Sequence, residues 1–320
     1  MDFTNVTCEA VETPVTVICA IYAFHVTVFF ILTYSIFKHK NCFHPFFSIF
    51  FGCFMLSYAV SDFFTFLRLT LYRLHISLGE GNVTVLRLYE ILYIYASPCA
   101  VAILIERLVA TLYPARYEHS RPWSLMIVAQ LLCMTVAILI VYSQEWHEES
   151  DIQEYCMVGN QALIIMTLII LLLVNRVRTR REIGSGQLRY RYQMSENITA
   201  LQLVIPVIVL DAMLTVVDIL WKLIFSVDLQ FEASQCDVKH YILKFTVSRL
   251  IRLMFEFFIQ IAVILQHPAI RKKVYLRLHC WSSPSQMGSQ EFHVKNVLGE
   301  DIHTKQTSDE HFCALRANWA

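Results

Sequence analysis

The sequence has few charged residues and few of the residues that break helices. Only 16% of its 320 residues are Asp, Glu, Lys or Arg, and glycine and proline occur eight times each. Soluble globular chains carry about 25% charged residues, so this composition argues against a soluble domain. The scarcity of glycine and proline excludes fibrous and low-complexity chains. Basic and acidic residues balance at 26 each, which argues against a nucleic-acid-binding protein.

Motifs for catalysis and metal binding are also missing. The sequence contains no Gly-x-Ser-x-Gly and no His-Glu-x-x-His, the patterns of common hydrolases. None of its ten cysteines forms a Cys-x-x-Cys pair or stands at metal-ligand spacing from a histidine. We therefore expect a protein that is not an enzyme and that needs no cofactor or metal.

Apolar residues, in contrast, make up 56% of the chain. A bilayer core about 30 Å thick requires about 20 mostly apolar residues in each helix that crosses it. Seven segments meet this length, and we predict an all-α integral membrane protein with a seven-transmembrane helix bundle. The predicted spans are residues 14–37, 45–71, 87–112, 123–142, 157–174, 198–225 and 240–265.

The segments between these spans differ in charge. Fourteen Lys and Arg residues lie on one side, in residues 38–44, 113–122, 175–196 and 266–280, whereas the other side has only Lys239. Because Lys and Arg are enriched in cytoplasmic loops, we expect the N-terminus outside and the C-terminus in the cytoplasm. This predicts four parts: an extracellular tail (1–13), the transmembrane domain (14–265), an amphipathic juxtamembrane helix (266–280) and a disordered cytoplasmic tail (281–320).

Two Asn-x-Thr sequons agree with this orientation. Asn5 and Asn82 both fall on the expected outer side, where glycosylation occurs. A third sequon, at Asn197, falls at the inner end of the sixth span, and we interpret it as a chance match.

The positions of four cysteines support predictions about disulfide formation and palmitoylation. Cys8, Cys156 and Cys236 are expected on the oxidising side, and a Cys156–Cys236 disulfide would join the second outer loop to the third. The alternatives are a bridge to Cys8 or free thiols. Cys280 follows the basic juxtamembrane segment, where it is a candidate for palmitoylation or remains an unmodified thiol.

Ionisable residues within the spans should face the bundle interior, because charge is costly in hydrocarbon. Asp211 and Asp218 are seven residues apart on one face of the sixth span. Arg249, Arg252 and Glu256 share one face of the seventh. We predict ion pairs from one of these aspartates to one of these arginines. The network either fixes the register of the two helices or forms a switch or a polar ligand site.

Glu106 and Arg107 are adjacent at the inner end of the third span. They are either an interfacial pair whose side chains reach toward water or a pair in which Glu106 holds Arg107 in one state and releases it in another. The surrounding sequence, Ile-Glu-Arg-Leu-Val-Ala-Thr at 105–111 followed by Tyr117-Glu118, resembles the E-R-x-x-A-T…Y-E motif of nematode chemosensory receptors of the Sra superfamily.

A second motif narrows this resemblance. Arg-Tyr-Gln-Met-Ser-Glu-Asn-Ile at 191–198, running on to Pro206, resembles the R-Y-Q-x-x-E-N-I…P motif of the Sre and Srab branches. Gln266-His267-Pro268 is similar to the end of the seventh span in that group. The sequence departs from rhodopsin-like receptors, because it lacks Asn-Pro-x-x-Tyr in the last span and places Cys99 in the middle of the third.

The resemblance implies a G-protein-coupled receptor in the plasma membrane of a sensory neuron, at its cilium. It would bind an environmental chemical in the outer half of the bundle and activate a heterotrimeric G protein inside. Candidate pocket residues are Glu90, Tyr93 and Trp221, although such aromatics could instead belong to an interfacial belt. The candidate coupling residues are Glu106, Arg107, Tyr117, Glu118, Arg191 and Tyr192.

Two other membrane functions compete with this one. A ligand-gated cation channel of the insect odorant-receptor kind also has seven spans, but its N-terminus lies inside, opposite to the charge distribution here. A secondary transporter is typically built from repeated halves with paired broken helices, and no such repeat is evident.

Overall fold

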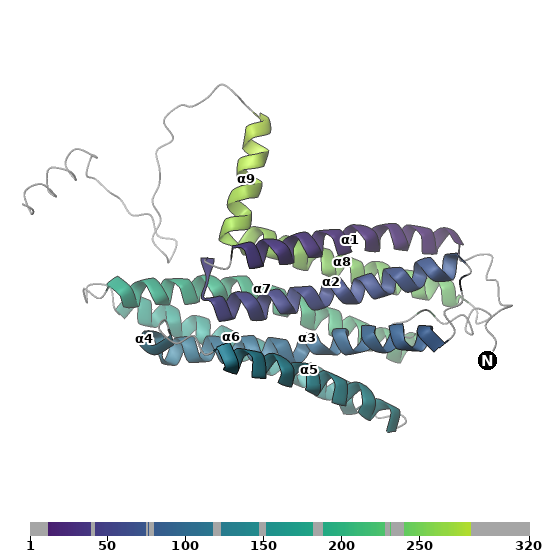
Figure 1. The fold of residues 1–320 in the computed structure, drawn as a ribbon, viewed down its shortest axis with the longest axis horizontal. Helices are drawn as coiled ribbons and strands as arrows, with labels where there is room; N and C mark the ends of the chain where they lie inside the picture. Colours follow the sequence, from purple (N-terminus) through teal and green to yellow (C-terminus); the bar gives the residue numbers. More distant parts are fainter. Residues whose placement is uncertain are drawn as a thin grey trace, which may run out of the picture. The chain divides into compact units, whose positions relative to one another are not determined.

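The computed structural model describes residues 12–39, 42–74, 76, 80–117, 123–146, 152–181, 188–227, 231 and 240–282. In this part of the chain all regular secondary structure is helical (Figure 1). Residues up to Tyr275 form one compact unit, and of the second unit only the last turns of α9 are described. The helices are α1 (Glu12–Lys38), α2 (Pro45–Arg73), α3 (Glu80–Leu112), α4 (Pro114–Tyr117), α5 (Trp123–Trp146), α6 (Ile152–Arg181), α7 (Leu188–Phe225), α8 (Tyr241–Gln266) and α9 (Pro268–Ser282).

The seven long helices α1, α2, α3, α5, α6, α7 and α8 form a bundle in which helices that follow one another in the chain run antiparallel (Figure 1). Helix α3 contacts α2, α5, α6 and α7, and α1 packs against both α2 and α8. We call the end where α3 finishes the Glu106 end, and the end where α8 begins the His240 end. This arrangement is the predicted seven-helix bundle.

Six of these helices are long and apolar enough to cross a membrane, and α8 is not among them. The reason is the number of charged residues, because Arg249, Arg252 and Glu256 all lie within its apolar stretch. All three are buried, with at most 2% of each residue exposed. The polar face of α8 therefore points into the bundle, as expected for ionisable residues at membrane depth.

Several helices are longer than the predicted spans. Helix α6 continues to Arg181 and α7 begins at Leu188, so much of the segment expected as a loop at 175–196 is helical. Helix α3 also begins seven residues earlier, at Glu80. The length of an apolar run measures only the part of a helix that is immersed in hydrocarbon. Neither glycine nor proline occurs in residues 175–181 or 188–196, so α6 and α7 continue as helices into polar sequence.

Two apolar clusters fill the interior. The larger one includes Phe47, Phe51 and Phe54 of α2, whose rings stack at 5.7 and 6.5 Å, and it extends to α3, α5, α6 and α7. The smaller one lies at the His240 end and is formed by α1, α2 and α8 with Val227 and Phe231. Polar side chains lie between and beside these clusters, where they form the sites described below.

Candidate functional site

At the Glu106 end, Glu106 and Arg107 form an ion pair that is hidden from solvent. Glu106 is 7% exposed and Arg107 is 1% exposed. The Arg107 Nε donates to Glu106 Oε2 at 2.5 Å, and Nη2 donates to Oε1. Two charge-assisted hydrogen bonds in this fork geometry are stronger than neutral ones. The two residues are therefore not an interfacial pair reaching toward water.

Tyr117 of α4 joins this pair from outside α3. Its hydroxyl donates to Glu106 Oε1 and accepts a hydrogen bond from Arg107 Nη2 at 3.0 Å. The Tyr117 ring lies 4.0 Å from the ring of His44, which precedes α2. The Arg107 guanidinium also lies over the Phe47 ring of α2, at 4.6 Å. Groups from α2, α3 and α4 thus surround one arginine.

Asn197 connects the same arginine to α7. Arg107 Nη1 donates to Asn197 Oδ1 at 3.0 Å, and Asn197 Nδ2 donates to Thr111 Oγ1 at 2.8 Å. Asn175 of α6 also donates to Thr111 Oγ1, at 3.0 Å, and Arg178 Nη1 donates to the Thr111 carbonyl at 2.7 Å. One residue of α3 therefore bridges α6 and α7, beside a fully buried cation.

The roles of Asn197, Thr111 and Asn175 were missed by sequence reasoning. The sequence alone places Asn197 in a motif and in a chance sequon, without a role, and its 3% exposure is incompatible with a glycan. The sequence contained a signal for two of them, because Thr111 and Asn197 belong to the two motifs quoted above. Polar residues inside long apolar runs bond across helices, because the alternative is an unsatisfied group in hydrocarbon.

A pocket opens next to this network. It is lined by His44, Arg107, Ala110, Pro114, Tyr117, Gln193, Glu196 and Asn197. The pocket thus combines the buried cation with polar side chains from the first turns of α7. A partner that entered here would meet the groups that hold Arg107.

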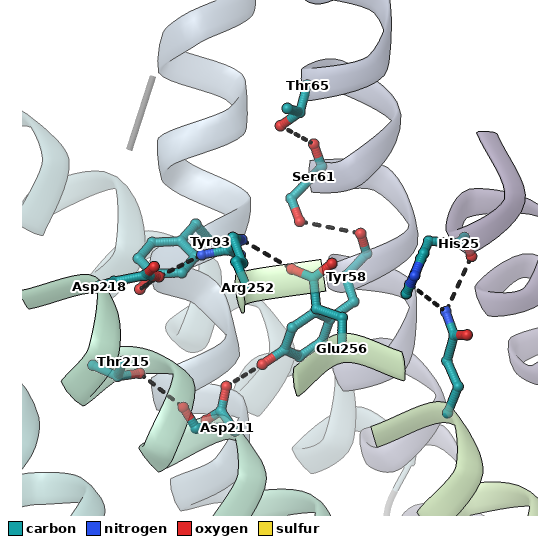
Figure 2. Close-up of polar contacts among 11 residues, drawn as sticks. His25, Tyr58, Ser61, Thr65, Tyr93, Asp211, Thr215, Asp218, Arg252 and Glu256 are labelled. Carbon is teal, nitrogen blue, oxygen red and sulfur yellow. Dashed lines mark hydrogen bonds and ion pairs between the residues drawn. The ribbon is translucent and has the colours of Figure 1, made fainter. Parts of the chain in front are cut away.

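The middle of the bundle holds a second network, shown in Figure 2. Arg252 of α8 pairs with Asp218 of α7 at 2.5 Å and with Glu256, one turn along α8, at 2.9 Å. The Tyr93 hydroxyl of α3 donates to Asp218 Oδ2 at 3.1 Å, and its ring lies 5.0 Å from the Arg252 guanidinium. One turn further along α8 from Glu256, Gln260 Nε2 lies 3.2 Å from Nδ1 of His25 in α1.

Asp211 has neutral partners instead of an arginine. The hydroxyl of Tyr58 donates to Oδ1, and Gln161 Nε2 donates to Oδ2 at 2.8 Å. These groups line a pocket between α2, α3, α6 and α7 that also includes Tyr93 and Thr215. Its full lining is Ser57, Tyr58, Ser61, Leu92, Tyr93, Ala96, Ser97, Met157, Gln161, Asp211 and Thr215.

Arg249 lies one turn before Arg252 on α8 and differs from it. It is 1% exposed, and none of its three side-chain nitrogens has a hydrogen-bond partner among the described residues. Its guanidinium lies 5.1 Å from the ring of Phe245. Of the two arginines considered for pairing with an aspartate of α7, the structure pairs Arg252 and leaves Arg249 without such a bond.

Comparison with known families identifies the chain. The family model for the Sre G protein-coupled chemoreceptor matches residues 82–320, which include both motifs and the members of the two networks that lie on α3, α4, α6, α7 and α8. The chain belongs to the Sre family. The resemblance to nematode chemoreceptors is thereby confirmed, and the Sre chain is a member of a chemosensory G-protein-coupled receptor family. A search among curated proteins gives no match.

The structure describes only some of the other site residues predicted for this Sre chain. Tyr93 lines the mid-bundle pocket, whereas Glu90 and Trp221 are partly buried and do not line it. Cys156 is exposed on α6. Asn5, Glu118 and Cys236 lie outside the described residues. Asn82, Arg191, Tyr192 and Cys280 lie in helices, but their side chains are not described.

Proposed function

We propose that this chain is a sensory receptor that binds a small environmental chemical and activates a heterotrimeric G protein at its Glu106 end. Family membership supports the class of receptor. The charge difference between the loops supports an outside N-terminus and a cytoplasmic C-terminus, and with them a cytoplasmic position for the Glu106 end. The proposed location is the plasma membrane, at the cilium of a sensory neuron.

The observation that carries the proposal is the position of α7. This helix bears Asp211 and Asp218 in the middle of the bundle and Asn197 at Arg107. Pro206 stands between these two regions and removes one backbone hydrogen bond of α7. A ligand that changes the contacts of Asp211 can therefore alter the hydrogen bond that holds Arg107.

The pocket around Asp211 is the proposed ligand site. It brings the Tyr58 and Tyr93 rings together with the amide of Gln161 and several hydroxyl groups. Binding sites commonly combine aromatic walls with a few polar groups in this way. To act as a signal, the chemical must bind one conformation of the bundle more tightly than the other.

At the other end, release of Arg107 from Glu106, Tyr117 and Asn197 would expose a cation to the G protein. Glu118, Arg191 and Tyr192 are proposed to contribute to the same contact. On the outer side we propose glycosylation of Asn5 and Asn82 and a Cys156–Cys236 disulfide, and on the inner side palmitoylation of Cys280.

The test is G-protein activation in cells that express the full chain with an N-terminal tag. Surface levels are matched by detecting the tag on intact cells, which also tests the orientation. Arg107→Ala is compared with Arg87→Ala. Arg87 belongs to the same helix but lies far from Glu106 along α3, and its guanidinium lies over the ring of Tyr142. A panel of volatile and water-soluble chemicals serves as the stimulus.

We expect a chemical response in the wild type and in Arg87→Ala that is lost in Arg107→Ala. An equal response in both variants would contradict the role of Arg107. An ion current that persists when G proteins are absent would identify a ligand-gated channel instead. A tag that is accessible only in permeabilised cells would overturn the orientation.

A further inference from the structure

The mid-bundle pocket contains a carboxylate, Asp211, whose direct partners are both neutral. The Tyr58 hydroxyl donates to one of its oxygens (Figure 2), and Gln161 Nε2 donates to the other at 2.8 Å. An ionised carboxylate offers only acceptors, which fits two oxygens that each receive a hydrogen bond. Asp211 is 4% exposed, so bulk water does little to screen its charge. This wall of the pocket therefore carries a buried negative charge without a directly bonded cation.

The arginines of the same region do not neutralise Asp211 by direct contact. Arg252 acts on it electrostatically, but its guanidinium is paired with Asp218 and Glu256. Apart from the Glu106–Arg107 pair, the buried carboxylates and guanidiniums of the described residues belong to Asp62, Asp211, Asp218, Glu256, Arg249 and Arg252. Four carboxylates are thus accompanied by two guanidiniums, and of the four only Asp211 lines the pocket. A cation bound there would reduce the excess of negative charge.

Most hydroxyl groups of the pocket have already used their proton. Those of Ser57, Ser61 and Thr215 donate to backbone carbonyls of their own helices, at 2.7, 3.1 and 3.0 Å. The Tyr93 hydroxyl donates to Asp218 at 3.1 Å. A hydroxyl that has donated its proton still has lone pairs with which to accept one. These groups therefore offer acceptors to a ligand, and not donors.

Gln161 adds an acceptor that has no donor among the described residues. Its side chain lines the pocket and the residue is 4% exposed. Nε2 is bonded to Asp211, whereas Oε1 has no hydrogen-bond partner in the described part of the chain. A buried acceptor without a donor is unfavourable. A ligand that brought a donor into the pocket would remove this cost.

A protonated amine matches this set of groups. An ammonium group has three N–H donors, no acceptor and a full positive charge. It can pair with Asp211 and at the same time donate to Gln161 Oε1 and to a hydroxyl oxygen. A hydroxyl compound has no charge to offer, and an acid would be repelled by Asp211. The rings of Tyr58 and Tyr93 line the same pocket, and aromatic rings attract cations to their faces.

The size of the pocket restricts the kind of amine. It leaves about 10 Å³ for the centre of a water-sized group, which is enough for about one such group. A primary ammonium is close to a water molecule in size, whereas a trimethylammonium is much larger and has no N–H. The apolar side chains of the lining are Leu92, Ala96 and Met157, against which an apolar body can pack.

We propose that the receptor recognises a small primary amine whose ammonium group pairs with Asp211 and donates to Gln161 Oε1, and whose apolar body packs on Leu92 and Met157. This deepens the proposed function and rests on it, because it names the chemical class that the Asp211 pocket takes. Discrimination between an amine and the corresponding alcohol follows, because the alcohol cannot neutralise the buried carboxylate.

The experiment measures the thermal unfolding of the purified full-length receptor in detergent at pH 7. The probes are butylammonium chloride and benzylammonium chloride. Butanol and benzyl alcohol are the neutral controls, benzyltrimethylammonium chloride is the bulky cation, and sodium chloride is varied separately. The variants are Asp211→Asn and Gln161→Leu. The matched control is Asp62→Asn, which removes a carboxylate that is 1% exposed and does not line the pocket.

We expect the two primary amines to raise the Tm of the wild type by about 2–4 °C at several times their dissociation constant. The alcohols, the trimethylammonium compound and sodium chloride should not produce this shift. Asp211→Asn should not respond to the amines, and Gln161→Leu should respond more weakly than the wild type. Asp62→Asn should keep the full shift, whatever its own Tm.

Three kinds of result would overturn the proposal. The first is the absence of an amine effect on the wild type. The second is an amine shift that persists in Asp211→Asn or is also lost in Asp62→Asn, which would mean that the pocket carboxylate is not the partner.

The third is an equal shift from another probe. An equal, Asp211-dependent shift from the alcohols would retain the pocket as the ligand site but refute the amine, and one from sodium chloride would identify an inorganic cation site. Because unfolding requires no G protein, each of these results leaves the proposed coupling to be judged by its own test.

Discussion

Arg107 of α3 donates a hydrogen bond to Asn197 of α7 at 3.0 Å, at the end of the bundle where the G protein is proposed to bind. Asn197 also donates to Thr111, one turn further along α3. A single amide of α7 is therefore bonded to two positions of α3. The bond is buried and involves a charged donor, and such bonds are worth about 1.5–3 kcal/mol. It therefore links α7 to the cation through a bond that is costly to break.

Loss of this link should raise signalling without ligand. Asn197→Ala removes the acceptor of Arg107 Nη1 and a donor to Thr111, which favours the state in which Arg107 is released. We expect basal G-protein activation to rise about five-fold, in line with a coupling energy of about 1 kcal/mol. The control is Asn160→Ala, which removes a hydrogen bond of 3.1 Å between α6 and Ser97 of α3. A comparable rise in that control would attribute the effect to general loosening of the bundle.

Tyr117 offers a finer perturbation of the same site. Tyr117→Phe removes the hydroxyl that contacts both Glu106 and Arg107, but keeps the ring that packs on His44. Since the direct ion pair remains, we expect a smaller rise in basal activation than in Asn197→Ala, with wild-type surface levels. Activation and surface level are read from the same cells. Basal activity at the wild-type level would show that the hydroxyl does not restrain Arg107.

In the mid-bundle network, Asp218 should matter more for stability than Asp211. Asp218→Asn removes the charge that pairs with Arg252 at 2.5 Å, whereas Asp211→Asn keeps a carbonyl oxygen for Tyr58 or Gln161 to donate to. Breaking a buried pair typically costs 3–5 kcal/mol, here reduced because Glu256 still faces Arg252. We expect a lower Tm for Asp218→Asn than for Asp211→Asn in detergent. The reverse order would contradict this account of the pairing.

The sequence was sufficient for the bundle but not for these pairings. Apolar runs predict spans because each helix must satisfy its backbone hydrogen bonds within itself, and the buried face of α8 was evident from the spacing of Arg249, Arg252 and Glu256. Which arginine meets an aspartate depends on the rotation and depth of α7 against α8. Those quantities follow from packing over whole helices, so the sequence left both arginines as candidates.

The Glu106 end shows the same limit. The motif placed Glu106, Arg107 and Tyr117 together, because they lie within twelve residues of each other. Asn175 and Asn197 are distant in sequence, and only the packing of α6 and α7 against α3 brings their amides to Thr111. A search of the sequence for polar residues within apolar runs would have found Asn175 and Asn197. It would not have shown that Thr111 is their common partner.

Two helical glycines provide a contrast in packing. A methyl group at Gly52 of α2 would lie 2.6 Å from ring carbons of Phe37 in α1, whereas one at Gly159 of α6 would have no atom within 4 Å. Gly52→Ala must displace that ring and should destabilise the receptor by about 1–3 kcal/mol. Gly159→Ala should stabilise it by about 0.5–1 kcal/mol, because alanine loses less backbone entropy in a helix. Tm values in detergent that moved in the same direction for both would refute the close approach of α1 and α2.

The junction between α8 and α9 should make the receptor sensitive to acid. Burial, together with the nearby His39, lowers the pKa of His267 to about 4 from its ordinary 6.5. Between these values the unfolded chain binds a proton that the folded chain does not, so stability falls as the pH falls from 6.5 towards 4. His267→Asn should therefore reduce the loss of Tm between pH 7 and pH 5.

The matched control is His240→Asn, at the other end of α8, where the residue is exposed and has φ 64°, a conformation that asparagine tolerates. A reduction of the Tm loss in His240→Asn equal to that in His267→Asn would contradict the assignment to His267. An unchanged slope in His267→Asn would mean that another group binds the proton, and the candidate next in reach is His39, whose pKa is lowered by partial burial and by Lys273 and Lys38.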